Sequence, residues 1–462
     1  MQLDEYDPRP AEATPVSGVR FPATLYSELC TALLADASRE ACAVAFARHD
    51  PATGSWVVAE AASVPEDAYE RRDAISAVLK AAFVVEVANR ARHDGLSIVV
   101  VHTHPQTKGF PAFSEEDDRG EAQLAQYFTR RAGGGKHLAL VIGPEGCRAR
   151  LLGGAEEISV WEVGANLALR SEAPLDSGDV SAHDRQVRAF GAPGQQLLRS
   201  LRIGVVGAGG TGSVLLQQLA HLGIQDFTLV EPDTVELTNL NRLVGAGPDD
   251  VGRPKVVVAA RMIRHINPKA RISALERDVA DADVPPHLAA LDFLFICTDS
   301  HASRAVVGQL AYQHLVPAID MGVSITVGQE GVTHITGRVQ MLAPGLPCLT
   351  CTGALNGEQI RRELLSPEQR AADPYVQGIY EPQPAVVSIN STMSSLAVTM
   401  FLGAVTPVPA GARFQMYDGV RGTVRLTTAT RVESCIVCSA AGAMARAGSW
   451  PLPVRQAGRG RG

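Results

Sequence analysis

Two histidines and a nearby carboxylate have the spacing of a metal site in the first third of the chain. His102 and His104 follow the apolar run LSIVVV, which is typical of a buried strand, and Asp117 comes one loop later. If the chain turns after the strand, the two imidazoles and the carboxylate converge on one ion. Three such ligands leave the fourth position of Zn²⁺ to water, the arrangement of catalytic zinc. We therefore expect a hydrolytic site here.

Hydrolysis by a metal-bound water also needs a base and a donor to the oxyanion. Glu40, in SREACAVAF, begins the first strand expected in this region and is the candidate base. The hydroxyl of Ser114 is the candidate donor. The acidic run EEDDRGE (115–121) is expected to be the solvated start of a helix rather than a second metal site.

A glycine-rich turn in the middle of the chain indicates a nucleotide site. It lies between the expected strand LRIGVVG (201–207) and the expected helix SVLLQQLAHLG (213–223), where backbone N–H groups approach phosphate. Glu231 ends the next strand, where an acidic side chain accepts hydrogen bonds from ribose hydroxyls. The glycines of this G-x-G-x-x-G motif are Gly207, Gly209, Gly210 and Gly212.

The residues that follow favour ATP over a dinucleotide. Asn239, Arg242 and Lys255 place amide and cationic donors after the ribose-binding strand. A triphosphate that loses pyrophosphate needs cations on its leaving group. Asp299, after the strand DFLFICT, is then a candidate Mg²⁺ ligand, because Mg²⁺ takes one or two carboxylates besides phosphate oxygens and water.

Two C-x-x-C pairs far apart in the sequence predict a second zinc site. Four thiolates complete a tetrahedral site and leave no position for water, so this zinc would be structural. No cysteine occurs between the pairs, and Cys297 ends an expected core strand, where it is expected to be packed. The expected ligands are Cys348, Cys351, Cys435 and Cys438.

Two α/β units are needed to position these motifs. Residues 1–20 are expected to form a flexible arm, and 21–154 an α+β unit with a helix at 71–93 and strands at 96–101, 137–143 and 148–153. Residues 155–183 are expected to be a linker. In 184–448 strands alternate with helices, which predicts a Rossmann-like unit with a mainly parallel sheet. The basic tail 449–462 is expected to be disordered.

Composition limits the function classes. The chain has 462 residues, 46% of them hydrophobic and 20% charged, which predicts two or three globular domains. The net charge of −7 argues against a nucleic-acid partner. No run of 18 or more apolar residues predicts a membrane span. The acidic, Pro-rich start is unlike a secretory signal, so we expect a cytoplasmic location. His265, His314 and His334 are given no role.

From Asp184 to about Cys438 the chain resembles the ubiquitin-activating-enzyme (ThiF/MoeB) superfamily, which includes bacterial enzymes of thiamine and molybdopterin synthesis. The resemblance rests on D-R-Q, G-x-G-G-x-G, D-x-V-x-x-x-N-L-N-R, G-x-P-K, C-T-D and the C-x-x-C pairs, in that order. It implies ATP·Mg²⁺-dependent adenylation of the C-terminal carboxylate of a ubiquitin-like or sulfur-carrier protein ending in Gly. Glu231 stands where the family usually has a ribose-binding Asp.

The same resemblance implies roles for further residues. Asn239, Arg242 and Lys255 match the triphosphate contacts, and Asp299 matches the metal ligand. Arg185 matches an Arg that related homodimers insert into the partner's ATP site, so a homodimer is expected. Relatives that form a thioester carry a Cys in the crossover loop, here 365–390, which has none. The enzyme is therefore expected to stop at the acyl-adenylate and pass it to an external nucleophile, such as a partner's Cys.

Roughly residues 20–154 resemble the JAB/MPN (JAMM) metalloprotease family, whose signature is an upstream Glu and H-x-H-P…S-x-x-D. The resemblance implies cleavage of peptide or isopeptide bonds after ubiquitin-like C-termini, with His102, His104 and Asp117 as zinc ligands. The stretch between His104 and Ser114 is about two residues longer than usual, and surface loops tolerate such extensions. Asp117 keeps S-x-x-D, while Asp118 stays open as the alternative ligand.

The fusion resembles bacterial ubiquitin-like operons and predicts a bifunctional enzyme that trims a carrier precursor or releases conjugates and adenylates the exposed Gly. A ubiquitin-conjugating-enzyme-like protein is a further expected partner.

Two alternatives to this function stay open. In the first alternative, the first domain serves only to dock the carrier, which predicts about one zinc per chain instead of about two. An NAD-dependent oxidoreductase would share the Rossmann core, although Arg242, Lys255 and Asp299 argue against it. The sequence does not separate sulfur transfer from protein conjugation.

Overall fold

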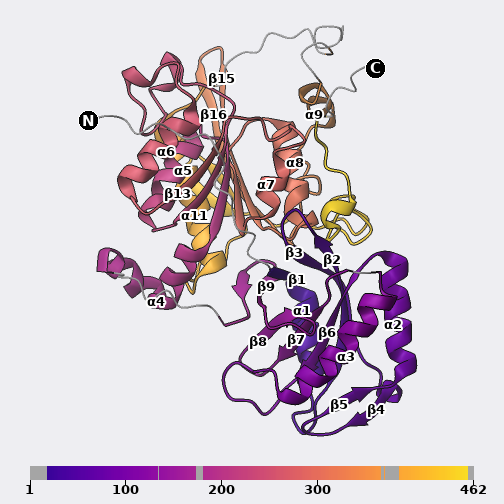
Figure 1. Cartoon of the computed structure of the whole chain (residues 1–462). Coiled ribbons are helices and arrows are strands. Elements are labelled where there is room, and N and C mark those ends of the chain that lie inside the picture. The colour runs from indigo at the N-terminus through magenta and orange to yellow at the C-terminus, as the bar shows by residue number, and fades with distance from the viewer. Residues whose placement is uncertain (1–17, 134, 173–180, 366–368, 370–383, 456–462) are drawn as a thin grey trace.

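The computed structural model describes residues 18–133, 135–172, 181–365, 369 and 384–455. The chain forms two units, each built on its own eight-stranded sheet, with the first unit below the second in Figure 1. Most of the expected arm (1–17), part of the expected linker (173–180) and the end of the tail (456–462) lie outside the described residues. So does most of the crossover loop.

The first unit is a sheet with helices on both faces. The strand order is β1-β3-β2-β6-β7-β8-β9-β10, and β1 also pairs with β9. Side chains alternate along β2, so Ala43 and Ala45 pack with helix α1 while Val44 and Phe46 pack with α2 and α3. The elements are β1 (Gly18–Pro22), α1 (Ala23–Leu33), β2 (Cys42–Asp50), β3 (Ser55–Ser63), α2 (Ala81–Asp94), β6 (Ser97–Thr103), α3 (Glu115–Arg131), β7 (Leu138–Ile142), β8 (Cys147–Leu151), β9 (Glu157–Val163) and β10 (Leu167–Leu169).

The helix expected at 71–93 begins ten residues later. Its first part is a hairpin, β4 (Tyr69–Arg72) and β5 (Ala77–Leu79), and only α2 is helical. The hairpin is held by contacts that local spacing does not encode: the amide of Cys42 donates to the hydroxyl of Tyr69 at 2.7 Å, and Arg72 Nε donates to the carbonyl of Glu40 at 2.7 Å. Tertiary contacts override helical spacing here.

Two expected boundaries also differ from the structure. Residues 18–20, expected in the arm, belong to the buried strand β1. Residues 157–169, expected in the linker, form β9 and β10 of the first sheet. The rhythm of this segment is hard to recognise because β10 has only three residues, Leu167–Leu169.

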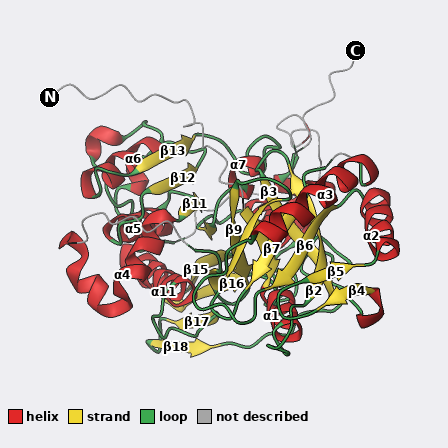
Figure 2. Cartoon of the chain, turned by 60° about the horizontal axis from the view of Figure 1, so that its bottom comes forward, coloured by secondary structure: helices red, strands yellow, loops and turns green. Residues whose placement is uncertain are grey.

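The second unit has a doubly wound core. The strand order is β13-β12-β11-β14-β15-β16-β17-β18, parallel from β13 to β15 and antiparallel from β15 to β18. Helices α5, α6 and α11 pack on one face, and α7 and α8 on the other (Figures 1 and 2). The strands are β11 (Arg202–Val206), β12 (Asp226–Val230), β13 (Arg271–Leu275), β14 (Phe293–Ile296), β15 (Ala318–Gly328), β16 (Gly331–Leu342), β17 (Phe414–Asp418) and β18 (Thr423–Leu426). The helices are α4 (Asp184–Ser200), α5 (Gly210–His221), α6 (Lys255–Ile266), α7 (Pro285–Ala289), α8 (His301–Gln313), α9 (Gly357–Glu363) and α11 (Val387–Val405).

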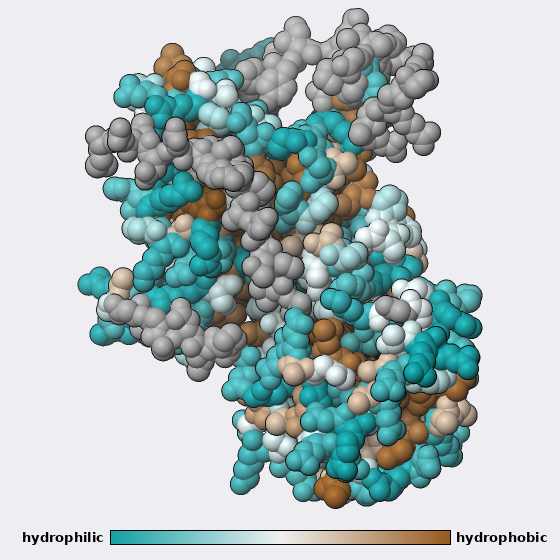
Figure 3. All heavy atoms as spheres, in the orientation of Figure 1, coloured by the Kyte–Doolittle hydropathy of each residue, from teal (hydrophilic) through white to brown (hydrophobic). Residues whose placement is uncertain are grey.

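Helix α11 is long and apolar enough to cross a membrane by length and composition. It packs instead inside the second unit, where Met393, Ala397 and Phe401 belong to the core formed with α5 and the sheet. In Figure 3 hydrophilic side chains make up most of the surface that is coloured by hydropathy, as expected when the apolar residues pack inside.

The two units share a buried interface. The guanidinium of Arg20 in β1 donates to the carbonyls of Leu291 at 2.7 Å and His314 at 3.1 Å. His314 Nδ1 lies 3.4 Å from a carboxylate oxygen of Asp50, at the end of β2. Apolar side chains of the first unit also join the core of the second: Val57, Val163 and Leu167. His314, given no role from the sequence, is therefore an interface residue.

The chain after residue 449, expected to be disordered, is described as far as Arg455. The guanidinium of Arg455 donates to Asp281 at 3.0 Å and to Asp278 at 2.5 Å. These contacts attach the end of the described chain to the loop before α7.

Candidate functional sites

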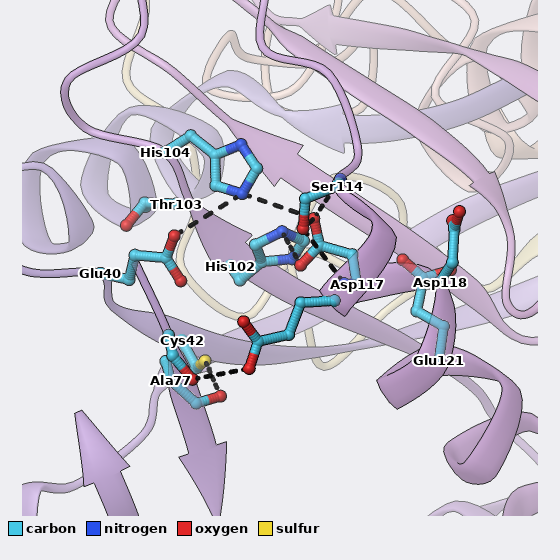
Figure 4. A network of polar contacts seen from close by, with 12 residues as sticks. Glu40, Cys42, Ala77, His102, Thr103, His104, Ser114, Asp117, Asp118 and Glu121 are labelled. Atoms are coloured by element: carbon cyan, nitrogen blue, oxygen red, sulfur yellow. Dashed lines mark hydrogen bonds and ion pairs between the residues drawn. The ribbon is translucent and has the colours of Figure 1, made fainter. Parts of the chain in front are cut away.

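The expected metal ligands of the first unit lie together. His102 near the end of β6 and His104 just after it place their Nε2 atoms 3.1 Å and 3.5 Å from the two carboxylate oxygens of Asp117 (Figure 4). One ligand atom of each residue lies within 4.8 Å of the others. Tetrahedral zinc ligands about 2.1 Å from the ion are separated by roughly 3.4 Å, so this donor set fits a zinc ion with an open fourth position.

Asp117 rather than Asp118 belongs to this cluster. Asp117 is the third residue of α3, and the hydroxyl of Ser114 caps that helix by accepting from the Asp117 amide at 3.2 Å. Burial would raise the pKa of Asp117, but hydrogen bonds from His102 and His104 hold that pKa well below its usual range. Asp118 instead accepts from Arg150 at 2.7 Å. The geometry therefore favours Asp117 as the third ligand.

Glu40 lies on the other side of His104. Its Oε1 atom is 3.6 Å from His104 Nε2. Glu40 precedes β2 in the sequence, and its side chain is buried. The backbone of Glu40 is held by the β4–β5 hairpin, because its amide donates to the carbonyl of Asp73 at 2.8 Å. Burial raises the pKa of Glu40, which suits a carboxylate that takes up a proton. No local pattern in the sequence indicates this support from the hairpin.

Ser114 is placed differently from the expectation. Its hydroxyl donates to Asp117 Oδ2 at 2.8 Å, so its proton is directed at the metal ligand rather than at a substrate oxygen. In this structure Ser114 orients Asp117 and caps α3. Donation to an oxyanion would require the hydroxyl to turn.

The glycine loop of the second unit has the backbone shape that it needs for phosphate. Gly207 has φ 97°, and a Cβ there would lie 2.7 Å from the backbone of Cys297. A Cβ at Gly212 would lie 1.9 Å from the carbonyl oxygen of Gly207. Gly209 has open space above it, and α5 begins directly after it, at Gly210. An anion can therefore reach the first N–H groups of α5.

Two residues that are expected to bind the nucleotide form hydrogen bonds with the loops around the nucleotide site in this structure. Glu231 is buried and accepts from the amides of Ala208 at 2.8 Å and Asp233 at 3.1 Å. Burial raises the pKa of Glu231. Asn239 accepts from the amide of Glu236 at 3.1 Å. A ribose or phosphate contact by Glu231 or Asn239 stays a prediction.

One expected cation lies against the glycine loop, and the other begins the helix that follows the ribose-binding strand. The stem of Arg242 passes within 3.3 Å of the point where a Cβ on Gly210 would lie. Lys255 begins α6 and its ammonium donates to Asp233 at 2.8 Å. Asp299 is exposed between β14 and α8. These groups stand at the carboxyl ends of neighbouring parallel strands, the usual ligand side of such a sheet.

Helix α11 supplies residues that sequence reasoning missed. Asn390 is buried, and its Nδ2 atom lies 2.3 Å from the Cβ position of Gly210. The hydroxyl of Ser394, one turn later, donates to the carbonyl of Thr211 at 2.9 Å. Both contacts span nearly two hundred residues of sequence, and an Asn after a long loop gives no distinctive signal.

Arg185 lies apart from the nucleotide site of its own chain. It is exposed at the start of α4, where the neighbouring Gln186 donates to the carbonyl of His221 at the end of α5. Helix α5 has 12 residues and is about 18 Å long. Arg185 therefore stands near the end of α5 opposite the glycine loop.

The four cysteines of the C-x-x-C pairs form one cluster. Sulfur atoms lie 3.5 Å apart for Cys348 and Cys435, 3.5 Å for Cys351 and Cys438, and 3.7 Å for Cys348 and Cys351. Four sulfurs around zinc at about 2.3 Å are separated by roughly 3.8 Å, so the cluster fits a tetrahedral zinc site. It joins the chain after β16 to the C-terminal segment.

Curated and solved proteins are similar to more than half of the chain. Molybdopterin-synthase adenylyltransferase of Escherichia coli is 28% identical over 268 residues, 58% of this chain and 99% of that protein. Sulfur carrier protein adenylyltransferase of Thermus thermophilus is 28% identical over 250 residues, 54% of this chain and 86% of that protein. A structure of E. coli MccB with AMPCPP and MccA aligns with 57% of this chain and 75% of that chain, at 18% identity and a TM-score of 0.44.

Two family descriptions match the chain side by side. Prokaryotic homologs of the JAB domain match residues 22–163, which end inside the first sheet. The ThiF family matches residues 183–437, more than half of the chain. The chain belongs to the ThiF family and carries a JAB-type domain at its N-terminal side.

Proposed function

We propose that the second unit adenylates the C-terminal carboxylate of a ubiquitin-like or sulfur-carrier protein. The observation that carries this proposal is the stem of Arg242 beside Gly210 of the glycine loop, together with Lys255 at the start of α6 on the carboxyl side of the sheet. A carboxylate oxygen of the carrier attacks the α-phosphorus of ATP, and the bond to pyrophosphate breaks. Arg242 and Lys255 reduce the charge on the leaving pyrophosphate. Curated relatives adenylate a molybdopterin synthase and a sulfur carrier protein, which supports this class of substrate.

Asp299 is the proposed Mg²⁺ ligand on this chain, since an exposed carboxylate at the carboxyl end of β14 suits an ion shared with phosphate oxygens. The ion would neutralise phosphate charge. Because the crossover loop has no Cys, we propose that the acyl-adenylate is passed to an external nucleophile, such as a Cys of a ubiquitin-conjugating-enzyme-like partner. The four-cysteine cluster is the proposed structural zinc site.

We propose that the first unit cleaves peptide or isopeptide bonds after the same kind of C-terminus. His102, His104 and Asp117 would hold the zinc, which supplies a water of lowered pKa. Glu40, whose carboxylate lies 3.6 Å from His104, would act as the general base and acid there, taking up a proton and giving it to the leaving amine. The position of the Ser114 hydroxyl, turned to Asp117, favours one alternative: a unit that only docks the carrier.

Carrier-dependent ATP–pyrophosphate exchange tests the first proposal. The probes are small β-grasp proteins that end in Gly and whose genes lie next to the gene of this chain. We expect Lys255→Ala and Arg242→Ala to remove the exchange, while the exposed Lys269→Ala leaves it unchanged. Glu40→Gln should leave exchange intact and abolish cleavage of an extended carrier. Exchange that survives in both cation variants, or that needs no carrier, would contradict the proposal.

We also propose a homodimer in the cytoplasm, formed through the second unit. The support is the exposed Arg185, which stands away from the glycine loop of its own chain and is available to a second copy. Light scattering after size-exclusion chromatography should give twice the mass of the chain. Arg185→Ala should lower exchange without changing that mass.

A further inference from the structure

We propose that the two sites act on separate carrier molecules, one bound at each end of the chain, so that a tail released at the first site reaches the second only through solution. The metal site here means Glu40, His102, His104 and Asp117. The nucleotide site means the glycine loop 207–212, Arg242, Lys255 and Asp299. The inference rests on the proposed function of both units.

The metal site lies at the end of the first unit that faces away from the second. Cys42, at the start of β2, pairs in register with His102. Asp50, at the other end of β2, reaches His314 of the second unit. The strand β2 therefore separates the metal site from the interface by about 27 Å, the length of the eight steps from Cys42 to Asp50 at 3.3–3.4 Å each.

The nucleotide site lies at the end of the second unit that faces away from the first. The interface uses the residues at the start of the parallel strands: Arg20 bonds to the carbonyl of Leu291, two residues before β14. The glycine loop follows the opposite ends of these strands. Helix α8 runs from the nucleotide site to the interface. Asp299 lies two residues before its start, and His314, directly after its end, lies at the interface. The 13 residues of α8 cover about 20 Å.

The interface holds the two units in this arrangement. Arg20 is fully buried and lies 3.9 Å from Asp292, which Arg202 also binds at 2.7 Å. In a second contact between the units, Arg413 of the second unit donates to Asn166 of the first at 2.7 Å. Contacts at two separated places, joined by a shared apolar core, oppose a swing of one unit about the other.

The resulting distance exceeds the reach of a short tail. Figure 1 places the β4–β5 hairpin, which supports Glu40, at the bottom of the first unit, and α9, which contacts Ser300, at the top of the second. Along β2 and α8 the separation is roughly 45 Å. A fully extended chain covers at most about 3.6 Å per residue, so at least about 13 free residues are needed. One carrier therefore cannot offer its C-terminal Gly to both sites of one chain from one docking position.

Isotope dilution tests this inference. The probe is the β-grasp protein that supports exchange in the assay above, made mature and as a precursor with ten extra residues after its Gly. The heavy-isotope precursor is mixed with a twentyfold excess of unlabelled mature carrier, the enzyme and ATP. Mass spectrometry then measures the heavy fraction in the adenylate and in the free mature pool. We expect the two fractions to be equal. A heavy fraction at least twofold higher in the adenylate would overturn the inference, whether the transfer occurs within a chain or to a partner.

Binding stoichiometry gives a second measurement. The Glu40→Gln variant with the precursor, mature carrier and a nonhydrolysable ATP analogue should show two carriers per chain by native mass spectrometry. Carriers that exclude each other would overturn the inference. Absence of any cleavage or exchange by the wild-type chain would instead contradict the proposed function, so the two failures are distinguishable.

Discussion

Glu40 and His104 face each other across 3.6 Å although they come from different parts of the first unit, the chain before β2 and the chain after β6. The contact places the buried carboxylate of Glu40 beside the cluster of His102, His104 and Asp117, which fits zinc. Glu40 itself is not a member of that cluster. The arrangement separates the holding of the ion from the handling of the proton.

Replacing Glu40 should therefore remove cleavage but not zinc. We expect Glu40→Gln to lower the cleavage rate by a factor of about 10² to 10⁴, the usual contribution of a general base. Zinc content measured by mass spectrometry of the metal should stay equal to that of the wild type. Glu28→Gln, on an exposed carboxylate of α1 in the same unit, is the control and should change neither the cleavage rate nor the zinc content. Loss of zinc in Glu40→Gln would mean that Glu40 is a ligand.

The two proposed zinc sites should be separable by metal content. The wild-type chain is expected to bind about two zinc ions, and His104→Ala about one, with little change in melting temperature. Cys438→Ser should also bind about one but unfold at lower temperature, because the four-cysteine cluster joins distant segments. Cys30→Ser is the matched control, since Cys30 lies outside the cluster. A wild-type content of one ion would support the docking alternative.

Glu363 should control the use of Mg²⁺ through the turn that carries Asp299. One oxygen of Glu363 accepts from the hydroxyl of Ser300 and from the amide of Ala302, both at 2.7 Å. We expect Glu363→Ala to raise the Mg²⁺ concentration for half-maximal exchange severalfold and to leave the rate at saturating Mg²⁺ nearly unchanged. Glu358→Ala, on the same helix but paired only with Arg361 and Arg362 in the described contacts, should behave like the wild type. A uniform loss of rate at every Mg²⁺ concentration would indicate a merely structural role.

Arg20 should be among the most costly positions for stability. In Arg20→Met the carbonyls of Leu291 and His314 lose their donor in a buried site. We expect a loss of about 3–5 kcal/mol in the free energy of unfolding, the range for removing one partner of a buried charged network. Arg188→Met removes an exposed pair with Asp184 and should cost less than about 0.5 kcal/mol. Urea denaturation followed by circular dichroism measures both. Equal effects of the two variants would contradict a fixed interface.

The interface should weaken in acid because of His314. Burial lowers the pKa of His314 to about 4, with a smaller opposing contribution from Asp50 and a further lowering by Arg20. The neutral form is favoured in the folded state, so this contribution to stability is present above pH ~6.5 and is lost as pH falls toward 4. The loss amounts to up to about 3 kcal/mol. His314→Gln should flatten the pH dependence of unfolding in this window, and the exposed His265→Gln should not.

The candidate sites could be predicted wherever their residues lie close in the sequence. His102, His104 and Asp117 share one strand and the next helix, and the glycine loop is a single turn, so local spacing was sufficient. The four cysteines were expected to meet because two C-x-x-C pairs are rarely accidental. The choice between Asp117 and Asp118 as the third ligand requires the structure. It depends on Arg150, which lies 32 residues after Asp118 in the sequence and binds its carboxylate.

What the sequence could not predict depends on distant partners. The segment 71–80 has helical spacing, yet contacts with Glu40 and Cys42 make it a hairpin. Asn390 reaches Gly210 from the other end of the second unit's sequence. Neither relationship leaves a local pattern, because it is satisfied only after the sheet has formed.

The position of Arg20 has a consequence for synthesis. Arg20 leaves the ribosome before its partners Ala289, Leu291 and His314, which follow it 269 to 294 residues later. At 5–20 residues per second, that interval lasts roughly 15 to 60 s. Until then the first unit must fold with the guanidinium of Arg20 in water and with Val57 and Val163 uncovered. A newly made chain therefore has a defined period in which it exposes an apolar surface to chaperones and to other nascent chains.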